Sequence, residues 1–188
     1  MPATVIHLGP LLPVTAAYAD VNARSLTGTY KFRSGDVDLQ FSLKKLGGGV
    51  VAGRFAEVTG SLVLDGKRPQ RSKIEMNVRL ASVETGSARM TGFLKSGVMF
   101  NVKKYPTARF VSTRVDVSGD TQAKVVGLLT LKGQTHPVTM TVDLLSGGRK
   151  KVRLKADGSF NRSKYGMNLG QPIYANRVRL GINLTGKR

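Results

Sequence analysis

The sequence predicts an all-β fold, an antiparallel barrel of about eight strands with one short helix in a long connection. The main observation is that apolar and polar residues alternate repeatedly from residue 29 onward, as they do in strands with one buried face. The chain also has 22 glycines and few segments with helical periodicity, which favours many turns. At 188 residues it is long enough to bury a sizeable core in one domain.

The first 19 residues differ from the rest of the chain. They contain no Lys, Arg, Asp or Glu, although 22% of the whole sequence is charged. They end in a small-x-small sequence at residues 17–19, which suits cleavage by signal peptidase. We therefore expect a signal peptide or, alternatively, a disordered leader at residues 1–19, and the folded domain at 20–188. A cleaved leader would make the protein periplasmic or secreted.

The strands are predicted from this alternation. It is clearest in five segments, residues 36–43, 73–80, 138–144, 151–160 and 177–184. Weaker strands are expected at residues 29–33, 50–65, 107–117 and 123–131. Because each strong strand has one apolar and one charged face, one sheet can close around its own apolar interior; a two-sheet sandwich would show the same pattern. A barrel of about eight strands is just wide enough to hold one elongated small ligand.

Two strands depart from strict alternation. In residues 107–117, Phe110 falls in phase with polar residues rather than with Val111 and Val115, which predicts a β-bulge. In residues 124–131 both faces are apolar, which predicts a strand covered on both sides.

One segment has a helical period instead. Met90, Phe93, Leu94, Gly97 and Val98 recur at the spacing of one helix face, which predicts a short amphipathic helix. This helix could close one end of the barrel or simply pack against the core.

The charge of the chain predicts an anionic partner. Thirty Lys and Arg residues against 11 Asp and Glu residues give a net charge of +19. The basic residues of the last two strands alternate outward: Lys151, Arg153, Lys155, Arg177 and Arg179. These outer faces carry no aromatic residues for stacking and the chain has no Trp, which argues against nucleic acid. The headgroups of an anionic membrane, contacted peripherally, or a diphosphate group on a lipid would account for the charge.

The sequence shows no catalytic or metal-binding constellation. The chain has no cysteine and two histidines, His7 in the leader and His136 in a predicted turn before a proline. These residues cannot supply a zinc site or a catalytic triad, so we expect neither an enzyme nor a bound metal or cofactor.

Several motifs together resemble a known family. Residues 105–138 contain the pattern YPxxxFxST followed by GxLTxxGxTxPV. Further matches are the Gly-Arg-Phe sequence at 53–55, the Ser-Val-Glu-Thr sequence at 82–85 and the Arg-Ser-Lys-Tyr-Gly-Met sequence at 162–167. Over residues 28–186 the chain resembles the YceI-like proteins, a lipocalin-like group that binds polyisoprenoid lipids.

The resemblance implies a lipocalin-like barrel with an extended apolar cavity for an isoprenoid or quinone-like lipid. The expected cavity residues are Phe41, Leu94, Phe100, Phe110, Leu129, Met140, Phe160 and Met167. The expected function is the non-catalytic binding, transport or storage of such a lipid. The alternative is a periplasmic or secreted stress or structural factor that acts through its basic surface on membranes or polyanions.

The chain departs from the family pattern at some polar positions. Lys164 and Val98 stand where the family motifs have Asp, and Asp36 stands where many members have His. The resemblance therefore implies a similar apolar chain in the cavity but leaves the lipid headgroup open.

Overall fold

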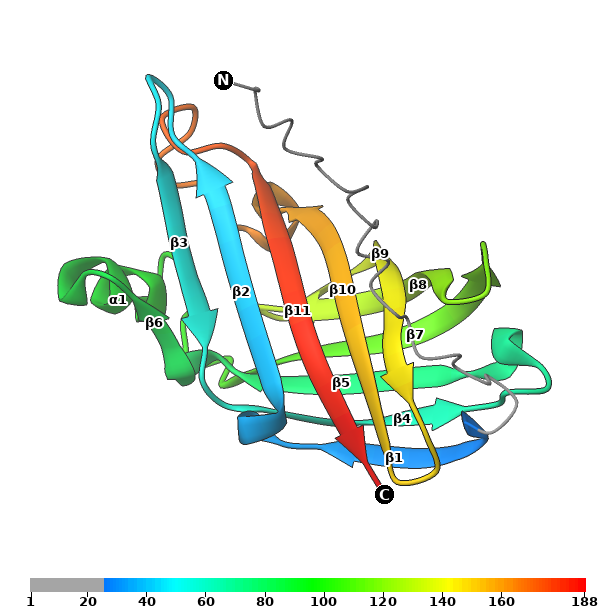
Figure 1. The fold of residues 1–188 in the computed structure, drawn as a ribbon. Coiled ribbons are helices and arrows are strands. Elements are labelled where there is room, and N and C mark those ends of the chain that lie inside the picture. Colours follow the sequence, from blue (N-terminus) through cyan, green and yellow to red (C-terminus); the bar gives the residue numbers. More distant parts are fainter. Residues whose placement is uncertain (1–25) are drawn as a thin grey trace, which may run out of the picture.

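The computed structural model describes residues 26–188, which form one antiparallel sheet of eleven strands and one α-helix (Figure 1). The predicted leader at residues 1–19 lies outside the described residues. The strands are β1 (Gly28–Phe32), β2 (Val37–Lys44), β3 (Val50–Phe55), β4 (Val58–Leu64), β5 (Lys73–Arg79), β6 (Val83–Thr85), β7 (Thr107–Val117), β8 (Gln122–Leu131), β9 (Gln134–Gly147), β10 (Lys151–Asn161) and β11 (Arg177–Lys187). The α-helix is α1 (Ala88–Lys95), and the short 3₁₀ turns are η2 (Ser34–Asp36), η3 (Pro69–Arg71), η4 (Leu80–Ser82) and η5 (Arg162–Tyr165).

Eight of the strands close into a barrel, in the order β1-β4-β5-β7-β8-β9-β10-β11. The barrel closes where Lys31 of β1 pairs with Lys187 at the end of β11. Over residues 179–184, β11 pairs instead with β2, and β2, β3 and β6 continue the sheet beyond the closed barrel. The prediction of an antiparallel barrel of about eight strands is confirmed, and the sandwich alternative is excluded.

The two predicted irregularities have different outcomes. The register between β7 and β8 shifts between Ser112 and Arg114, so the predicted β-bulge is present. This bulge lets Phe110 line the barrel interior while Val115, five residues later, is also buried. The prediction that residues 124–131 are covered on both sides is wrong, because Leu128 is 43% exposed on the outer face of β8.

The helix is present but shorter than predicted. Ser87 caps its amino end, since the Ser87 hydroxyl accepts a hydrogen bond from the backbone N–H of Met90. Only Leu94 of the helix is buried; Phe93 and, beyond the helix, Val98 are exposed. The helix therefore buries fewer residues than the apolar spacing of the sequence predicted. The loop that follows the helix supplies the next buried residues, Met99 and Phe100.

An ion pair lies at the closure of the barrel. Asp36 in η2 pairs with the ammonium of Lys187, the residue through which β11 meets β1. The hydrogen bond from Lys187 is the main cause that lowers the pKa of Asp36 below its usual value. Because the folded pKa is the lower one, the pair stabilises the fold above the unfolded pKa of 3.8, and this contribution is lost as the pH falls through the folded pKa.

We expect Asp36→Asn to lower the free energy of unfolding by about 0.5–1 kcal/mol at neutral pH, a modest value because half-exposed Lys187 remains in contact with water. Urea unfolding of both proteins should show this difference at neutral pH but not in acid below the folded pKa of Asp36, where residue 36 is uncharged in both proteins. An equal difference at both pH values would show that the substitution acts through packing and not through the ion pair.

Candidate ligand cavity

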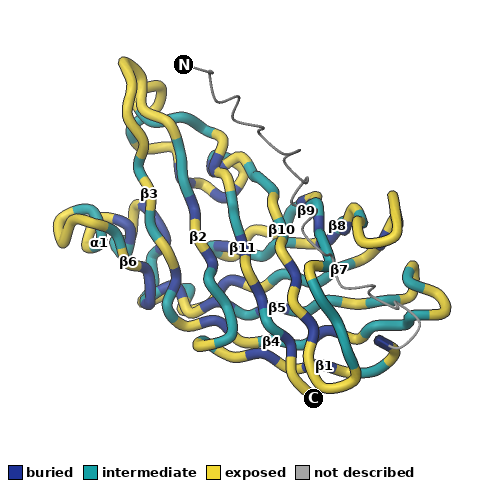
Figure 2. Tube along the Cα trace, viewed as in Figure 1, coloured by how far each residue is buried: buried dark blue, intermediate teal, exposed yellow. Residues whose placement is uncertain are grey.

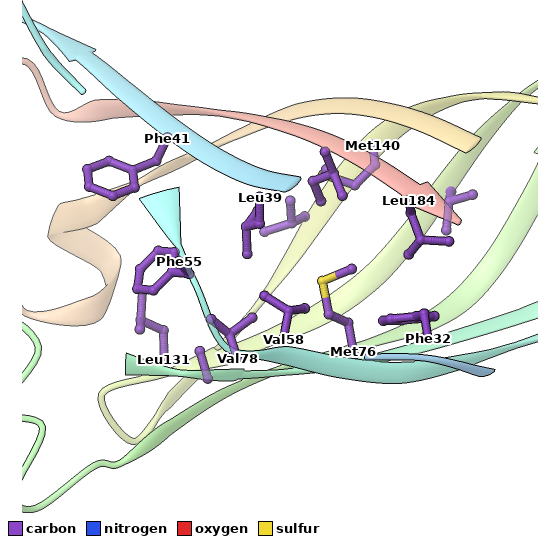
Figure 3. Packing of buried hydrophobic residues seen from close by; sticks show 14 of the residues in the cluster. Phe32, Leu39, Phe41, Phe55, Val58, Met76, Val78, Leu131, Met140 and Leu184 are labelled. Carbon is purple, nitrogen blue, oxygen red and sulfur yellow. The ribbon is translucent and has the colours of Figure 1, made fainter. Parts of the chain in front are cut away.

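The barrel encloses an apolar cavity with a volume of about 140 Å³. Figure 3 shows how its walls face each other: Phe41 and Leu39 of β2 lie opposite Val78 and Met76 of β5. Arg109 and Arg162 are the two charged residues along its lining, and all the others are apolar. Arg109 pairs with Glu75 at 2.7 Å, and both side chains are about half exposed. A space of this character favours a hydrocarbon chain over a polar ligand.

The structure brings all eight predicted cavity residues together on this lining. They come from β2, from β7 to β10, from the helix, and from the loops that follow the helix and β10: Phe41, Leu94, Phe100, Phe110, Leu129, Met140, Phe160 and Met167. Whether these residues contact a lipid stays a prediction. The sequence analysis missed Arg162 as a lining residue, although the alternation that turns Phe160 inward also points to Arg162, two positions later.

Glycines opposite large side chains set the width of the cavity. Gly158 of β10 lies opposite Met140 of β9, and Gly53 of β3 lies opposite Phe41 of β2. A Cβ atom on Gly158 would lie 2.2 Å from the sulfur of Met140, and one on Gly53 would lie 2.6 Å from the Phe41 ring. Met140 and Phe41 can therefore lie flat along the neighbouring strand, where they occupy less of the interior.

A second cavity, also of about 140 Å³, occupies the other end of the barrel. The β4–β5 and β7–β8 loops close it, through residues that include Pro69 and Asp120. The two cavities share four side chains as a common wall: Ile74, Val125, Val142 and Leu154. The interior of the barrel is thus one apolar space divided into two compartments by a thin layer of side chains.

The buried guanidinium of Arg162 organises the loop between β10 and β11. Arg162 is 2% exposed and donates to the carbonyl oxygens of Leu169 and Tyr174, both at 2.9 Å, and of Ala175 at 3.1 Å, as well as to that of Met167. No carboxylate among residues 26–188 pairs with it, and burial lowers its pKa. These charge-assisted hydrogen bonds fold the loop back over one end of the first cavity.

Tyr165 belongs to the same loop and lies behind the cavity wall. Its ring packs edge-on against Phe160, with centroids 5.3 Å apart, and against His136 at 5.2 Å. Its buried hydroxyl has no hydrogen-bond partner within residues 26–188, and burial raises the pKa of Tyr165 to about 12. The expectation that His136 lies in a turn is wrong: it belongs to β9, and its Nε2 lies 2.9 Å from the carbonyl oxygen of Lys164.

We expect Tyr165→Phe to raise the free energy of unfolding by about 1 kcal/mol, because a buried hydroxyl without a partner carries an uncompensated desolvation cost. The measurement is thermal or urea unfolding of protein that has been stripped of lipid, compared with the parent protein treated identically. A clear loss of stability would show that the hydroxyl has a favourable partner in the folded protein.

The predicted basic surface lies on the outside of the barrel. All five of its residues are exposed on or beside the outer faces of β10 and β11: Lys151, Arg153, Lys155, Arg177 and Arg179. Lys155 pairs with Asp157 at 3.3 Å, and the other four take part in no ion pair within the described part of the chain. Lys151 lies directly opposite Lys187 across the sheet, so like charges concentrate there.

The described residues contain no group of three or more His, Asp or Glu side chains that could hold a metal ion. None of the helices within residues 26–188 has the length and apolar composition needed to cross a membrane.

Comparison with known sequences identifies relatives over most of the chain. The model of the YceI-like domain matches residues 30–186. A UPF0312 protein of Pseudomonas paraeruginosa is 41% identical over 155 residues, which cover 80% of this chain and 81% of the relative. A UPF0312 protein of Photorhabdus laumondii is 34% identical over 145 residues, 74% of this chain and 73% of the relative.

Solved structures with the same fold are more distant in sequence. BcnA of Burkholderia cenocepacia superimposes with a TM-score of 0.73 at 22% identity, covering 79% of this chain and 95% of BcnA. A polyisoprenoid-binding domain from Saccharophagus degradans superimposes with a TM-score of 0.68 at 14% identity, covering 86% of this chain and 98% of that domain. These similarities show that the barrel has the same fold in all three proteins.

Proposed function

The chain belongs to the YceI-like family, and from this premise we propose that it binds one elongated, largely apolar lipid, an isoprenoid or quinone-like molecule, for transport or storage without chemical change. The observation that carries the proposal is the apolar cavity inside the barrel, whose lining is hydrophobic apart from Arg109 and Arg162. The shared fold with a polyisoprenoid-binding domain supports the same ligand class.

The energetics of the cavity favour a hydrocarbon chain. Each buried CH₂ group contributes about 0.8 kcal/mol, so a five-carbon isoprene unit contributes about 4 kcal/mol. Several units are needed to offset an association cost of roughly 4–15 kcal/mol. Neither cavity alone has this room, because an engineered cavity of ~150 Å³ in another protein holds only a benzene-sized molecule. A longer chain must therefore occupy both compartments and displace part of the wall between them.

The composition of the wall allows such a displacement. Four of the six methionines in the chain line the first cavity, at positions 76, 99, 140 and 167. Methionine is unbranched and has three rotatable side-chain bonds, so it can change rotamer at low cost as a ligand enters. Met140 is also the cross-strand neighbour of Val125, which belongs to the wall shared by the two cavities.

We expect Met140→Phe to shorten the longest polyprenol that the protein retains, because a rigid ring beside Val125 would obstruct passage into the second cavity. Met140→Arg should abolish retention, since it places an unpaired charge in apolar surroundings. Gly158→Ala should act in the same direction as Met140→Phe, because the added methyl group would push the Met140 side chain into the cavity. Native mass spectrometry against polyprenols of increasing length measures the effect.

The matched control is Leu128→Phe, which adds a similar ring on the outer face of β8 and should leave chain length unchanged. If the parent protein retains no polyprenyl or quinone-like lipid, or if Met140→Phe leaves the length preference unaltered, the interior is a filled core and the proposal is wrong.

We further propose that the protein is exported and acts in the periplasm or outside the cell. The support is the uncharged segment at residues 1–19 with its small-x-small ending. We expect exported protein to begin at Asp20, which intact-mass measurement of material purified from the native compartment would show. Retention of residues 1–19 in that material would contradict the proposal.

A further inference from the structure

One end of the barrel carries an exposed apolar tip. Among residues 26–188, four of the ten exposed large hydrophobic side chains lie there, each more than half exposed: Leu46, Val50, Leu169 and Ile173. Leu46 and Val50 flank the turn between β2 and β3, and the other two belong to the loop between β10 and β11. Figure 2 shows the β2–β3 turn as an exposed projection at the top of the molecule. Exposed hydrophobic side chains that are scattered singly are normal, whereas a cluster of them at one site indicates an interaction surface.

Backbone hydrogen bonds hold the two halves of the tip together. The N–H of Leu46 donates to the carbonyl oxygen of Ile173 at 2.8 Å, and the N–H of Ala175 donates to that of Lys44 at 2.9 Å. Lys45 and Tyr174 form an isolated β-bridge between the same two segments. Leu46 and Ile173 are therefore presented side by side by an ordered structure, although they are far apart in the sequence.

The tip is also positively charged. Lys44, Lys45 and Lys164 are exposed in the same two segments, and none of them takes part in an ion pair within residues 26–188. Neither segment, residues 39–56 or 158–176, contains an Asp or Glu. Apolar side chains surrounded by cations, without nearby carboxylates, match a bilayer surface that offers acyl chains beneath anionic headgroups.

The tip adjoins the cavity lining along the chain. Leu43, Arg162 and Met167 line the first cavity, and each lies within a few residues of the exposed lysines and hydrophobic residues of the tip. Arg162 holds the loop that carries Leu169 through a hydrogen bond to its carbonyl oxygen. The tip, whose composition suits a membrane surface, therefore lies beside the first cavity.

We propose that this tip, and not the basic outer face of β10 and β11, docks the protein on anionic lipid bilayers. Leu46 and Ile173 enter the acyl-chain region while Lys44, Lys45 and Lys164 contact the headgroups. The inference extends the proposed lipid-binding function, on which its purpose rests, by naming the surface through which a lipid leaves the bilayer for the barrel.

The absence of Trp from the sequence makes the docking surface directly observable. The full-length variants Leu46→Trp and Ile173→Trp each carry one fluorescent reporter at the tip, and Leu128→Trp carries one at an exposed apolar position on β8. With vesicles that contain phosphatidylglycerol, the emission of both tip variants should shift to shorter wavelength, and that of Leu128→Trp should not. No shift at the tip, or an equal shift for Leu128→Trp, would overturn the proposal.

Vesicle co-sedimentation separates the two basic surfaces. Lys44→Gln with Lys45→Gln should weaken binding to the same vesicles by about 30-fold at low salt, since each Lys near the surface contributes about 1 kcal/mol. Lys151→Gln with Arg153→Gln removes the same number of charges from the β10 face and should have little effect. If the β10 pair weakens binding and the tip pair does not, the sheet face docks and the proposal is wrong.

The apolar part of the tip is tested by Leu46→Ser with Ile173→Ser, which should weaken vesicle binding at least about tenfold. The melting temperature should stay unchanged because both side chains are exposed. If the parent protein instead sediments as a dimer that this variant dissociates, the tip is a self-association surface and the proposal fails.

Measuring ligand retention distinguishes a failure of the docking proposal from a failure of the proposed lipid-binding function. The tip variants should still retain polyprenol added in detergent, as measured by native mass spectrometry, because the cavity is unchanged. If the protein docks through the tip but retains no lipid, the docking proposal is supported and the lipid-binding function is refuted. If it retains lipid but does not dock through the tip, the lipid-binding function is supported and the docking proposal is refuted.

Discussion

The closure of an eight-stranded sheet is the constraint on which the rest of the structure depends. Once the sheet closes, every inward side chain faces a shared interior, and the residues along the strands decide whether that interior is filled. Here Met140 and Phe41 lie over glycines of the neighbouring strands, which keeps both side chains close to the wall. The space that remains is divided into two apolar compartments by a layer that includes Val125 and Leu154.

The same closure explains why the two ends of the barrel differ. β11 pairs with β1 only near its carboxyl end and with β2 over most of its length, so the sheet opens into an extension formed by β2, β3 and β6. At that end, long segments cover the interior: the helix with its following loop, and the loop between β10 and β11. At the opposite end, the β4–β5 and β7–β8 loops close the second cavity.

Arg162 links the interior to the outer surface at the extended end. A buried guanidinium would be costly without partners, and here backbone carbonyl groups of one loop satisfy it instead of a carboxylate. The result is a rigidly held loop whose buried residue Met167 lines the cavity and whose exposed residues Leu169 and Ile173 form part of the tip. Cavity and tip are thus two faces of the same ordered segment.

The sequence by itself determined which side chains face the interior, because the period of a strand assigns alternate residues to opposite faces. That is why the five expected residues that belong to strands line the cavity, and why the odd spacing of Phe110 and Val115 indicated a bulge. Only the tertiary structure decided that the sheet closes, that Leu128 is exposed and that Leu46 lies beside Ile173. These features depend on contacts between segments distant in the chain, and local periodicity carries no information about such contacts.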